Sequence, residues 1–153
     1  MIKLRLDVDY PYPSRFQSIL FTILNRKITS NYLKNSKIIA KMVNESPREV
    51  MAYWFFTPQT TPDMEMLQLM RQCPDRHEAA LHVATNPYKE LERLEQITNQ
   101  KLRYYTIHGT ARLFARLMWR RNIHQARVPI PDGFPLKNFW EFPTIGLDRV
   151  CYS

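Results

Sequence analysis

Glycine is scarce in this chain, which has three glycines and eleven prolines among its 153 residues. Loops that cradle a nucleotide phosphate need closely spaced glycines, because only glycine lets the backbone approach the phosphate at such positions. The sequence holds no glycine-rich segment of this kind and none of the usual nucleotide-binding motifs. It therefore argues against a protein that binds a nucleotide through a glycine-rich loop.

Cysteine is also rare, since Cys73 and Cys151 are the two in the chain and lie far apart. They make no metal-binding cluster, and free thiols are typical of a cytoplasmic protein. No apolar run is long enough to span a bilayer, and Met1 leads directly into a strand-like segment without a signal-peptide pattern. We therefore expect a cytoplasmic protein with no membrane partner.

The overall composition is that of a globular domain, with 44% apolar and 24% charged residues. The length suits one hydrophobic core, so we expect a single domain over residues 1–153. The net charge of +8 would suit an anionic partner such as nucleic acid, but no run of Lys and Arg exceeds two residues. Nucleic acid is therefore the least favoured partner.

The opening segment, residues 3–13, predicts a strand that ends in a loop. Apolar and polar residues alternate from Leu4 onward with the period of a β-strand. Asp7 and Asp9 are two residues apart, so they point to the same face at the C-terminal end of this strand. Adjacent carboxylates repel each other, and such a pair suits a metal ligand beside a general base. The structural alternative is an acidic turn residue and a cap before Tyr-Pro.

Strand-like and helix-like segments alternate along the rest of the chain. Further strands are expected at 50–56, 77–83 and 102–107, each preceded by a helical pattern. This order implies an α/β fold with a parallel sheet or barrel and helices outside. In such folds the polar residues at the C-terminal strand ends form the site. His82 and His108 fall at such ends, together with the two aspartates.

Caps and buried faces are also expected for the helices. Thr61 is expected to cap the third helix and Asn86 the fourth, because both residue types accept hydrogen bonds from a first turn. We expect Met64 to face inward and Glu90 to face outward. In the second helix, over residues 29–44, Ile38 and Met42 are also expected to face inward. His77 is expected to be structural or on the surface rather than in the site, because its odd spacing from His82 places the two on opposite faces.

A carboxylate and two histidines from separate strand ends can hold a zinc-class ion with an open position for water. The metal would acidify that water, and a neighbouring carboxylate would take its proton. This chemistry hydrolyses an amide or an ester.

These motifs resemble the polysaccharide deacetylase family, the NodB-homology group of carbohydrate esterases. Leu6-Asp7-Val8-Asp9 is similar to the family's first motif, and His77-Glu78-Ala79-Ala80-Leu81-His82 to its second. Tyr104-Tyr105-Thr106-Ile107-His108-Gly109 resembles the third, and Trp140-Glu141-Phe142-Pro143 resembles a later strand. The resemblance covers the whole chain in order. It implies an irregular seven-stranded (β/α) barrel, which is incomplete in this chain.

The resemblance also implies roles for individual residues. Asp7 would be the catalytic base, and Asp9 and His82 would bind a divalent metal, for which zinc is expected. Asn86 stands where the family has its second metal histidine. The family's late histidine, a general acid, has no counterpart here, so His108 is the candidate to replace a ligand or the acid.

The implied function is removal of an acetyl group from an N- or O-acetylated sugar. Tyr10, Tyr12 and Thr106 are the candidates for contact with the carbohydrate or other acylated small molecule, although the tyrosines also suit packing. An inactive relative that binds a glycan is the main alternative, favoured by Asn86 and by the missing late motif. An incomplete barrel exposes sheet edges, and such edges would allow the protein to pair with a second copy as a homo-oligomer.

Overall fold

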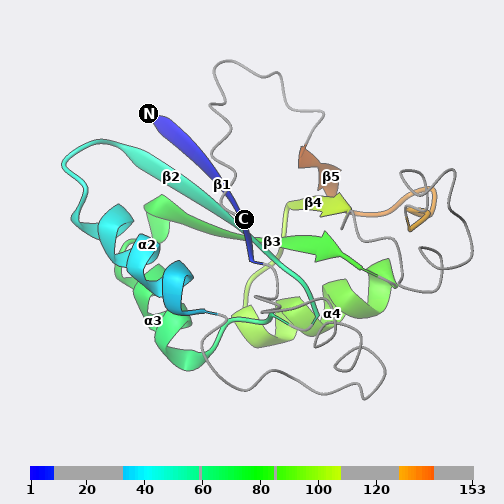
Figure 1. Ribbon diagram of the computed structural model, residues 1–153. Coiled ribbons are helices and arrows are strands. Elements are labelled where there is room, and N and C mark those ends of the chain that lie inside the picture. The colour runs from blue at the N-terminus through cyan, green and yellow to red at the C-terminus, as the bar shows by residue number, and fades with distance from the viewer. Residues whose placement is uncertain (9–32, 59, 85, 108–127, 140–153) are drawn as a thin grey trace, which may run out of the picture.

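The computed structural model describes residues 1–8, 33–58, 60–84, 86–107 and 128–139, which form a parallel α/β fold (Figure 1). The five strands make one sheet in the order β1-β2-β3-β4-β5, and every neighbouring pair is parallel. The expected α/β class is therefore confirmed. The elements are β1 (Ile2–Val8), α2 (Lys34–Glu45), β2 (Val50–Phe56), α3 (Met64–Gln72), the 3-10 turn η1 (Pro74–Arg76), β3 (His77–Val83), α4 (Pro87–Thr98), β4 (Tyr104–Ile107) and β5 (Lys137–Asn138).

The two central strands, β2 and β3, are continuous apolar runs rather than alternating ones. Trp54, Phe55 and Phe56 are each fully shielded from solvent, although successive residues point to opposite faces. A parallel strand with neighbours on both sides is covered on both faces, which explains this composition. The expected bounds of both strands are confirmed, whereas β4 begins at Tyr104 rather than at residue 102.

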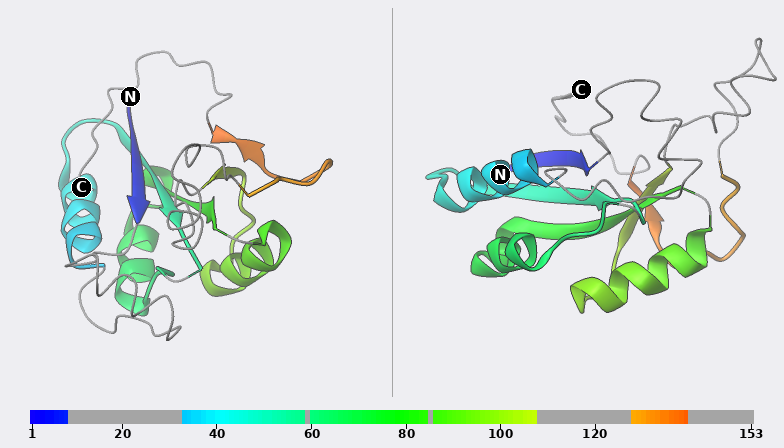
Figure 2. Two further views of the ribbon diagram at one scale, coloured as in Figure 1. Left: turned by 45° about the vertical axis from the view of Figure 1, so that its right-hand side comes forward. Right: turned by 60° about the horizontal axis from the view of Figure 1, so that its bottom comes forward.

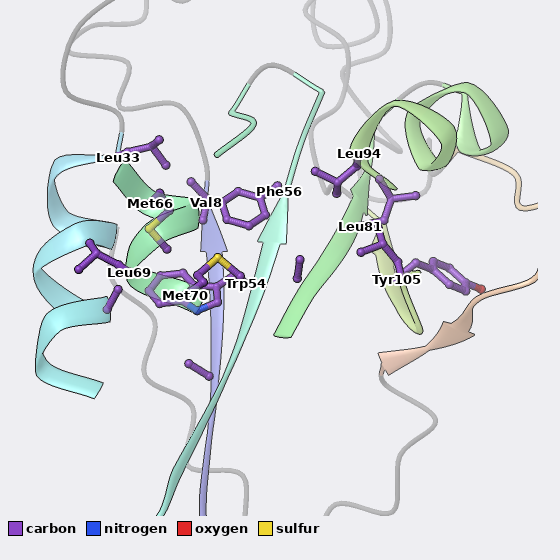
Figure 3. Close-up of a cluster of buried hydrophobic side chains, with 14 of the residues drawn as sticks. Val8, Leu33, Trp54, Phe56, Met66, Leu69, Met70, Leu81, Leu94 and Tyr105 are labelled. Carbon is purple, nitrogen blue, oxygen red and sulfur yellow. The ribbon is translucent and has the colours of Figure 1, made fainter. Parts of the chain in front are cut away.

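The three helices of the described part of the chain pack on one face of this sheet, here called the helix face. Trp54 and Phe56 point to this face and lie among side chains of α3 (Figure 3). Strands in sequential order with right-handed crossovers place every helix on the same side, which accounts for the arrangement. The main core joins residues of all three helices to the sheet: Ala40, Val43, Met66, Leu69, Met70, Leu91 and Leu94.

The opposite face, here called the open face, bears none of the helices in the described ranges. Its buried cluster consists of aromatic residues around a small one: Tyr53, Phe55, Ala80, Tyr104 and Phe139. The ring of Phe139 lies 5.1 Å from the ring of Tyr53 and 5.0 Å from that of Phe55. Strands β5 and β2 are three positions apart, about 14 Å in a flat sheet. The sheet therefore curls toward the open face, and Figure 2 shows β4 and β5 turned steeply against β1–β3.

The start of α3 differs from expectation. Asp63, not Thr61, is the N-cap, and its carboxylate accepts a hydrogen bond of 2.9 Å from the Met66 backbone N–H. A carboxylate is favoured there because its charge also complements the helix dipole. Met64 becomes the first helical residue and is 65% exposed, so the inward face is formed by later residues of α3.

The buried stripe of α2 also differs from expectation. Ile38 and Met42 are exposed, whereas Ala40 is fully buried and Val43 nearly so. The small side chain of Ala40 lets the helix approach the sheet closely, so the helix is turned with this residue inward. The apolar pattern alone does not distinguish between these two rotations.

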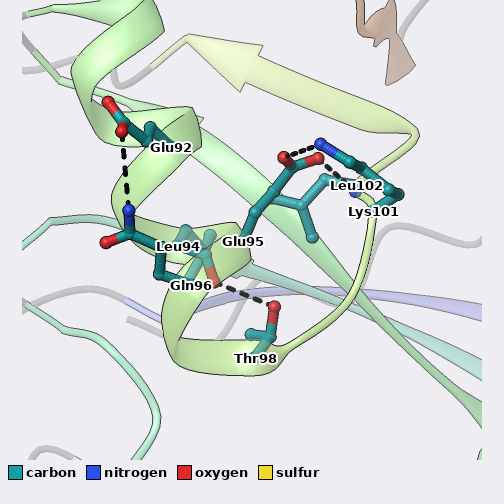
Figure 4. A network of polar contacts seen from close by, with 7 residues as sticks. All are labelled: Glu92, Leu94, Glu95, Gln96, Thr98, Lys101 and Leu102. Atoms are coloured by element: carbon teal, nitrogen blue, oxygen red, sulfur yellow. Dashed lines mark hydrogen bonds and ion pairs between the residues drawn. The ribbon is translucent and has the colours of Figure 1, made fainter.

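The end of α4 is fixed to the segment just before β4 by a short polar network (Figure 4). The carboxylate of Glu95 accepts hydrogen bonds from the Leu102 backbone N–H at 3.0 Å and from the Lys101 amine at 2.7 Å. The Thr98 hydroxyl donates to the Leu94 carbonyl, and Asn99 ends the helix in the left-handed conformation. None of the helices in the described residues is long and apolar enough to cross a membrane.

Candidate functional site

The C-terminal ends of β1 to β4 bring polar side chains to one edge of the sheet, on the open face. His82 of β3 pairs in register with Thr106 of β4. Thr57 directly follows Phe56, which pairs with Leu81, so Thr57 lies beside His82 in the same row. Asp7 pairs with Phe55 and lies one row closer to the N-terminal edge. The expected strand bounds predicted that Asp7 and His82 lie at strand ends, and the register places both on the same face.

His82 is held by Thr106 inside the protein. The ring nitrogen Nδ1 lies 2.7 Å from the Thr106 hydroxyl, and the two residues are 4% and 0% exposed. This hydrogen bond fixes the orientation of the imidazole and assigns Nδ1 to the hydroxyl. The structure thus gives Thr106 a contact with the histidine; its expected contact with substrate remains a prediction.

Asp7 is held by an arginine that the sequence reasoning did not include. Arg5 donates from Nε to one carboxylate oxygen at 2.9 Å and from Nη2 to the other at 2.7 Å. Its guanidinium also lies over the ring of Phe55, 5.3 Å from the centroid. A bidentate pair of this kind fixes the plane of the carboxylate. The signal was available, because opposite charges two residues apart in a strand share a face.

Asp7 and His82 do not contact each other. The register puts them two strands and two residues apart, about 12 Å between Cα atoms in a flat sheet. Asp9, the expected metal ligand of the first motif, lies outside the described residues, as do Tyr10, Tyr12 and His108.

Asn86 caps α4, as the sequence predicted. Its side-chain oxygen accepts a hydrogen bond of 3.2 Å from the Lys89 backbone N–H. A metal ion at the same oxygen would compete with this cap, and an amide oxygen is a weak ligand for zinc. Its role as a metal ligand remains a prediction that the capping geometry disfavours.

Two buried residues hold the loops that follow β2 and β3, and the sequence predicted this role for neither of them. The Thr60 hydroxyl, fully buried, donates to the Val8 carbonyl at the end of β1. Glu90 accepts hydrogen bonds from the Ala84 and Asn86 backbone N–H groups at 2.8 and 2.9 Å. Glu90 was expected to face outward, but it is 6% exposed because its carboxylate satisfies these two donors.

A protein zinc site needs at least three donor side chains around one point. Among the described residues, no group of three or more His, Cys, Asp and Glu side chains could hold a metal ion. His82 fits one position, because metal-binding histidines have their second nitrogen held by a polar partner, as Thr106 does here. Asn86 does not fit. A complete set would need Asp9, which the resemblance names and the described residues do not include.

His77 lies on the helix face and serves the core. Its Nδ1 accepts a hydrogen bond of 3.0 Å from the Trp54 indole, and its Nε2 lies 2.7 Å from the Asn44 side-chain oxygen. Burial lowers the pKa of His77 to about 4, and the charge of Arg76 adds to this effect. Its expected position opposite His82 is confirmed, and it takes no part in the candidate site.

Comparison of the chain with protein families, with curated proteins and with solved structures gives no match. The protein belongs to the parallel α/β fold class, and polar residues lie at the carboxyl ends of its strands.

Proposed function

We propose that the protein is a metal-dependent hydrolase similar to polysaccharide deacetylases, which removes an acetyl group from an N- or O-acetylated sugar. The observation that carries this proposal is the imidazole of His82, held through Nδ1 by Thr106 at the edge where β1 also ends. Parallel α/β proteins bind their ligands at this edge of the sheet. The two-residue spacing of Asp7 and Asp9 in the sequence predicts two carboxylates on the same face of a strand.

The residues have distinct roles in this proposal. His82 and Asp9 would bind a divalent cation, with zinc as the expected ion, and the ion would supply an acidified water molecule. Asp7 would take a proton from that water, with its carboxylate plane held by Arg5. His108 would protonate the leaving group.

We also propose that the sheet belongs to an irregular (β/α) barrel, as the resemblance implies. Three observations support this: the strands are in sequential order, the helices of the described part share one face, and Phe139 reaches the rings of β2. A doubly wound sheet would instead reverse its strand order and place helices on both faces. Tyr10 and Tyr12 would then line the mouth of the barrel, near the substrate.

A second candidate is a protein that binds a carbohydrate or other acylated small molecule without hydrolysing it. The observation that favours it is the use of Asn86, which caps α4 at the place where the family has a metal histidine. With one ligand fewer, the site would hold a cation weakly and retain mainly its polar contacts for a sugar.

The two candidates are distinguished by incubating the zinc-loaded protein with an N-acetylated amino-sugar oligomer and measuring the acetate released. We expect activity in the wild type, a loss of about 10² to 10⁴-fold in Asp7→Asn, and wild-type activity in the control Glu92→Gln. Glu92 is an exposed carboxylate on α4, away from the strand ends. Sugar binding without acetate release would favour the second candidate. Neither binding nor release would contradict both.

A further inference from the structure

Two exposed apolar side chains lie next to each other on the outer side of α2. Ile38 is 50% exposed and Met42 is 64% exposed, and a spacing of four residues makes them neighbours on a helix. Ala40, between them, is fully buried and points to the sheet, so at about 3.6 residues per turn both side chains point away from it. Helix α2 lies at one margin of the helix layer, beside α3 (Figure 2). The pair therefore forms one apolar surface in contact with solvent.

Polar residues extend this apolar surface toward both ends of the helix. Asn35 is exposed and lies three residues before Ile38. Glu45 is exposed and lies three residues after Met42. Spacings that alternate between three and four residues are typical of the seam along which two helices pack. Lys34, also exposed, lies beside Asn35 in the first turn of α2, and we call these five residues the outer stripe of α2.

The two ends of the outer stripe carry charges that do not stabilise their own helix. Lys34 is the first residue of α2 and Glu45 the last. The helix dipole favours negative charge at the first turn and positive charge at the last, so both charges are at the disfavoured end. A partner that brings an acid to Lys34 and a base to Glu45 would compensate both of them.

We propose that the outer stripe binds the same stripe of a second copy of this chain, with the two α2 helices antiparallel about a twofold axis near Ala40. Each Ile38 then packs on the partner's Met42. At a rise of about 1.5 Å per residue, Lys34 lies about 9 Å before the axis and Glu45 about 8 Å after it. Each Lys34 is therefore level with the partner's Glu45, whereas a parallel pair would set like charges opposite each other.

The small size of the outer stripe predicts a weak dimer. A stable interface buries about 800 Å² on each partner, which is more than one side of a short helix provides. Lys41 lies beside the stripe near the axis, close to its own copy, and its charge opposes pairing unless the flexible side chain extends into solvent. We therefore expect a dissociation constant in the micromolar range. This surface differs from the sheet edges through which the sequence predicted pairing.

Sedimentation velocity of the 153-residue chain, from low to high micromolar concentration in dilute salt, tests the inference. We expect the mean mass to rise from the 18.4 kDa of one chain toward twice that value. Ile38→Glu and Met42→Glu should remain monomers with unchanged circular dichroism, because both positions are exposed. The control Tyr88→Glu replaces a 48% exposed side chain on α4 and should dimerise as the wild type does. A wild type that is monomeric at every concentration would overturn the inference, and so would a dimer that both α2 variants leave intact.

A charge exchange tests the antiparallel arrangement. We expect Lys34→Glu and Glu45→Lys each to weaken the dimer about 3- to 10-fold, and the double variant to recover the wild-type affinity. The exchanged charges also suit the helix dipole, so the double variant should fold. A double variant weaker than either single variant would contradict the antiparallel arrangement. If the wild type stays monomeric and instead binds vesicles that contain phosphatidylserine, the outer stripe serves a membrane surface and the inference is wrong.

Discussion

At the scale of single residues, His77 joins three elements on the helix face. Its ring accepts from the indole of Trp54 in β2 and contacts Asn44 in α2, and Asn44 donates in turn to the Leu69 carbonyl in α3. Both ring nitrogens are used, so the neutral ring with its proton on Nε2 fits the site. A second proton would displace the indole.

This arrangement predicts that stability falls in mild acid. The folded pKa of His77 is about 4 and lies below the ordinary value of 6.5, so the folded protein favours the neutral ring. The stabilisation is complete above pH 6.5 and declines as the pH falls toward 4, by at most about 3 kcal/mol. Urea unfolding at several pH values measures this slope.

His77→Gln is the control, because it keeps a polar side chain and removes the titration. We expect its unfolding free energy to change less between pH 6.5 and pH 4.5 than that of the wild type. Parallel slopes for the two proteins would contradict the buried, neutral state of His77.

At the scale of elements, the loop between β3 and α4 depends on a buried acid. Glu90 accepts from the Ala84 and Asn86 backbone N–H groups just beyond the strand that carries His82. Its negative charge also lies near the positive end of the α4 dipole. The carboxylate therefore accepts hydrogen bonds from the backbone of the loop and also stabilises the start of α4.

Replacement of Glu90 should destabilise the protein, by an amount that depends on whether the new side chain can still accept a hydrogen bond. We expect Glu90→Gln, which keeps an oxygen acceptor, to cost about 1 kcal/mol, and Glu90→Ala to cost about 2–4 kcal/mol because two buried donors lose their partner. Chemical unfolding measures both, with Glu92→Ala on the exposed side of α4 as the control. If Glu90→Ala costs no more than the control, the loop does not depend on this contact.

The sequence predicted several of these elements well, but it did not predict the hydrogen bonds of Glu90 and Thr106. β2 and β3 were recognisable because continuous apolar runs are typical of central parallel strands, and the Asn86 cap because it precedes Pro87. Glu90 was placed outside because helix periodicity says nothing about donors that a neighbouring loop supplies. Thr106 was assigned to substrate because its contact with His82 depends on the pairing of β3 with β4, which one sequence does not reveal.

At the scale of the whole molecule, the alternation of strands and helices left a flat sheet or a barrel open, and only the family resemblance implied a curled sheet. Alternation of strands and helices predicted the parallel sheet, but curvature arises from packing between strands far apart in the chain. Here Phe139 belongs to the same buried cluster on the open face as Ala80 and contacts the rings of Tyr53, Phe55 and Tyr104. We regard Phe139 as the residue that stabilises the curled form.

Shortening this side chain should weaken the whole fold. Phe139 is 4% exposed, and we expect Phe139→Ala to lower the unfolding free energy by about 3–5 kcal/mol, with Phe139→Leu at a smaller cost because it leaves a smaller cavity. Thermal unfolding of both variants gives the measurement. A cost below about 1 kcal/mol for Phe139→Ala would show that this contact does not support the sheet.

The central claim is that the strand ends at His82 form a cation site, and zinc content per chain tests it most directly. Protein loaded with zinc and then desalted is analysed by elemental mass spectrometry, alongside the variants His82→Ala and Asp9→Ala and the control Glu92→Ala. We predict about one zinc ion per chain in the wild type and the control, and a loss of it in both site variants. Zinc retained by His82→Ala at the wild-type level, or absent from the wild type, would contradict the account.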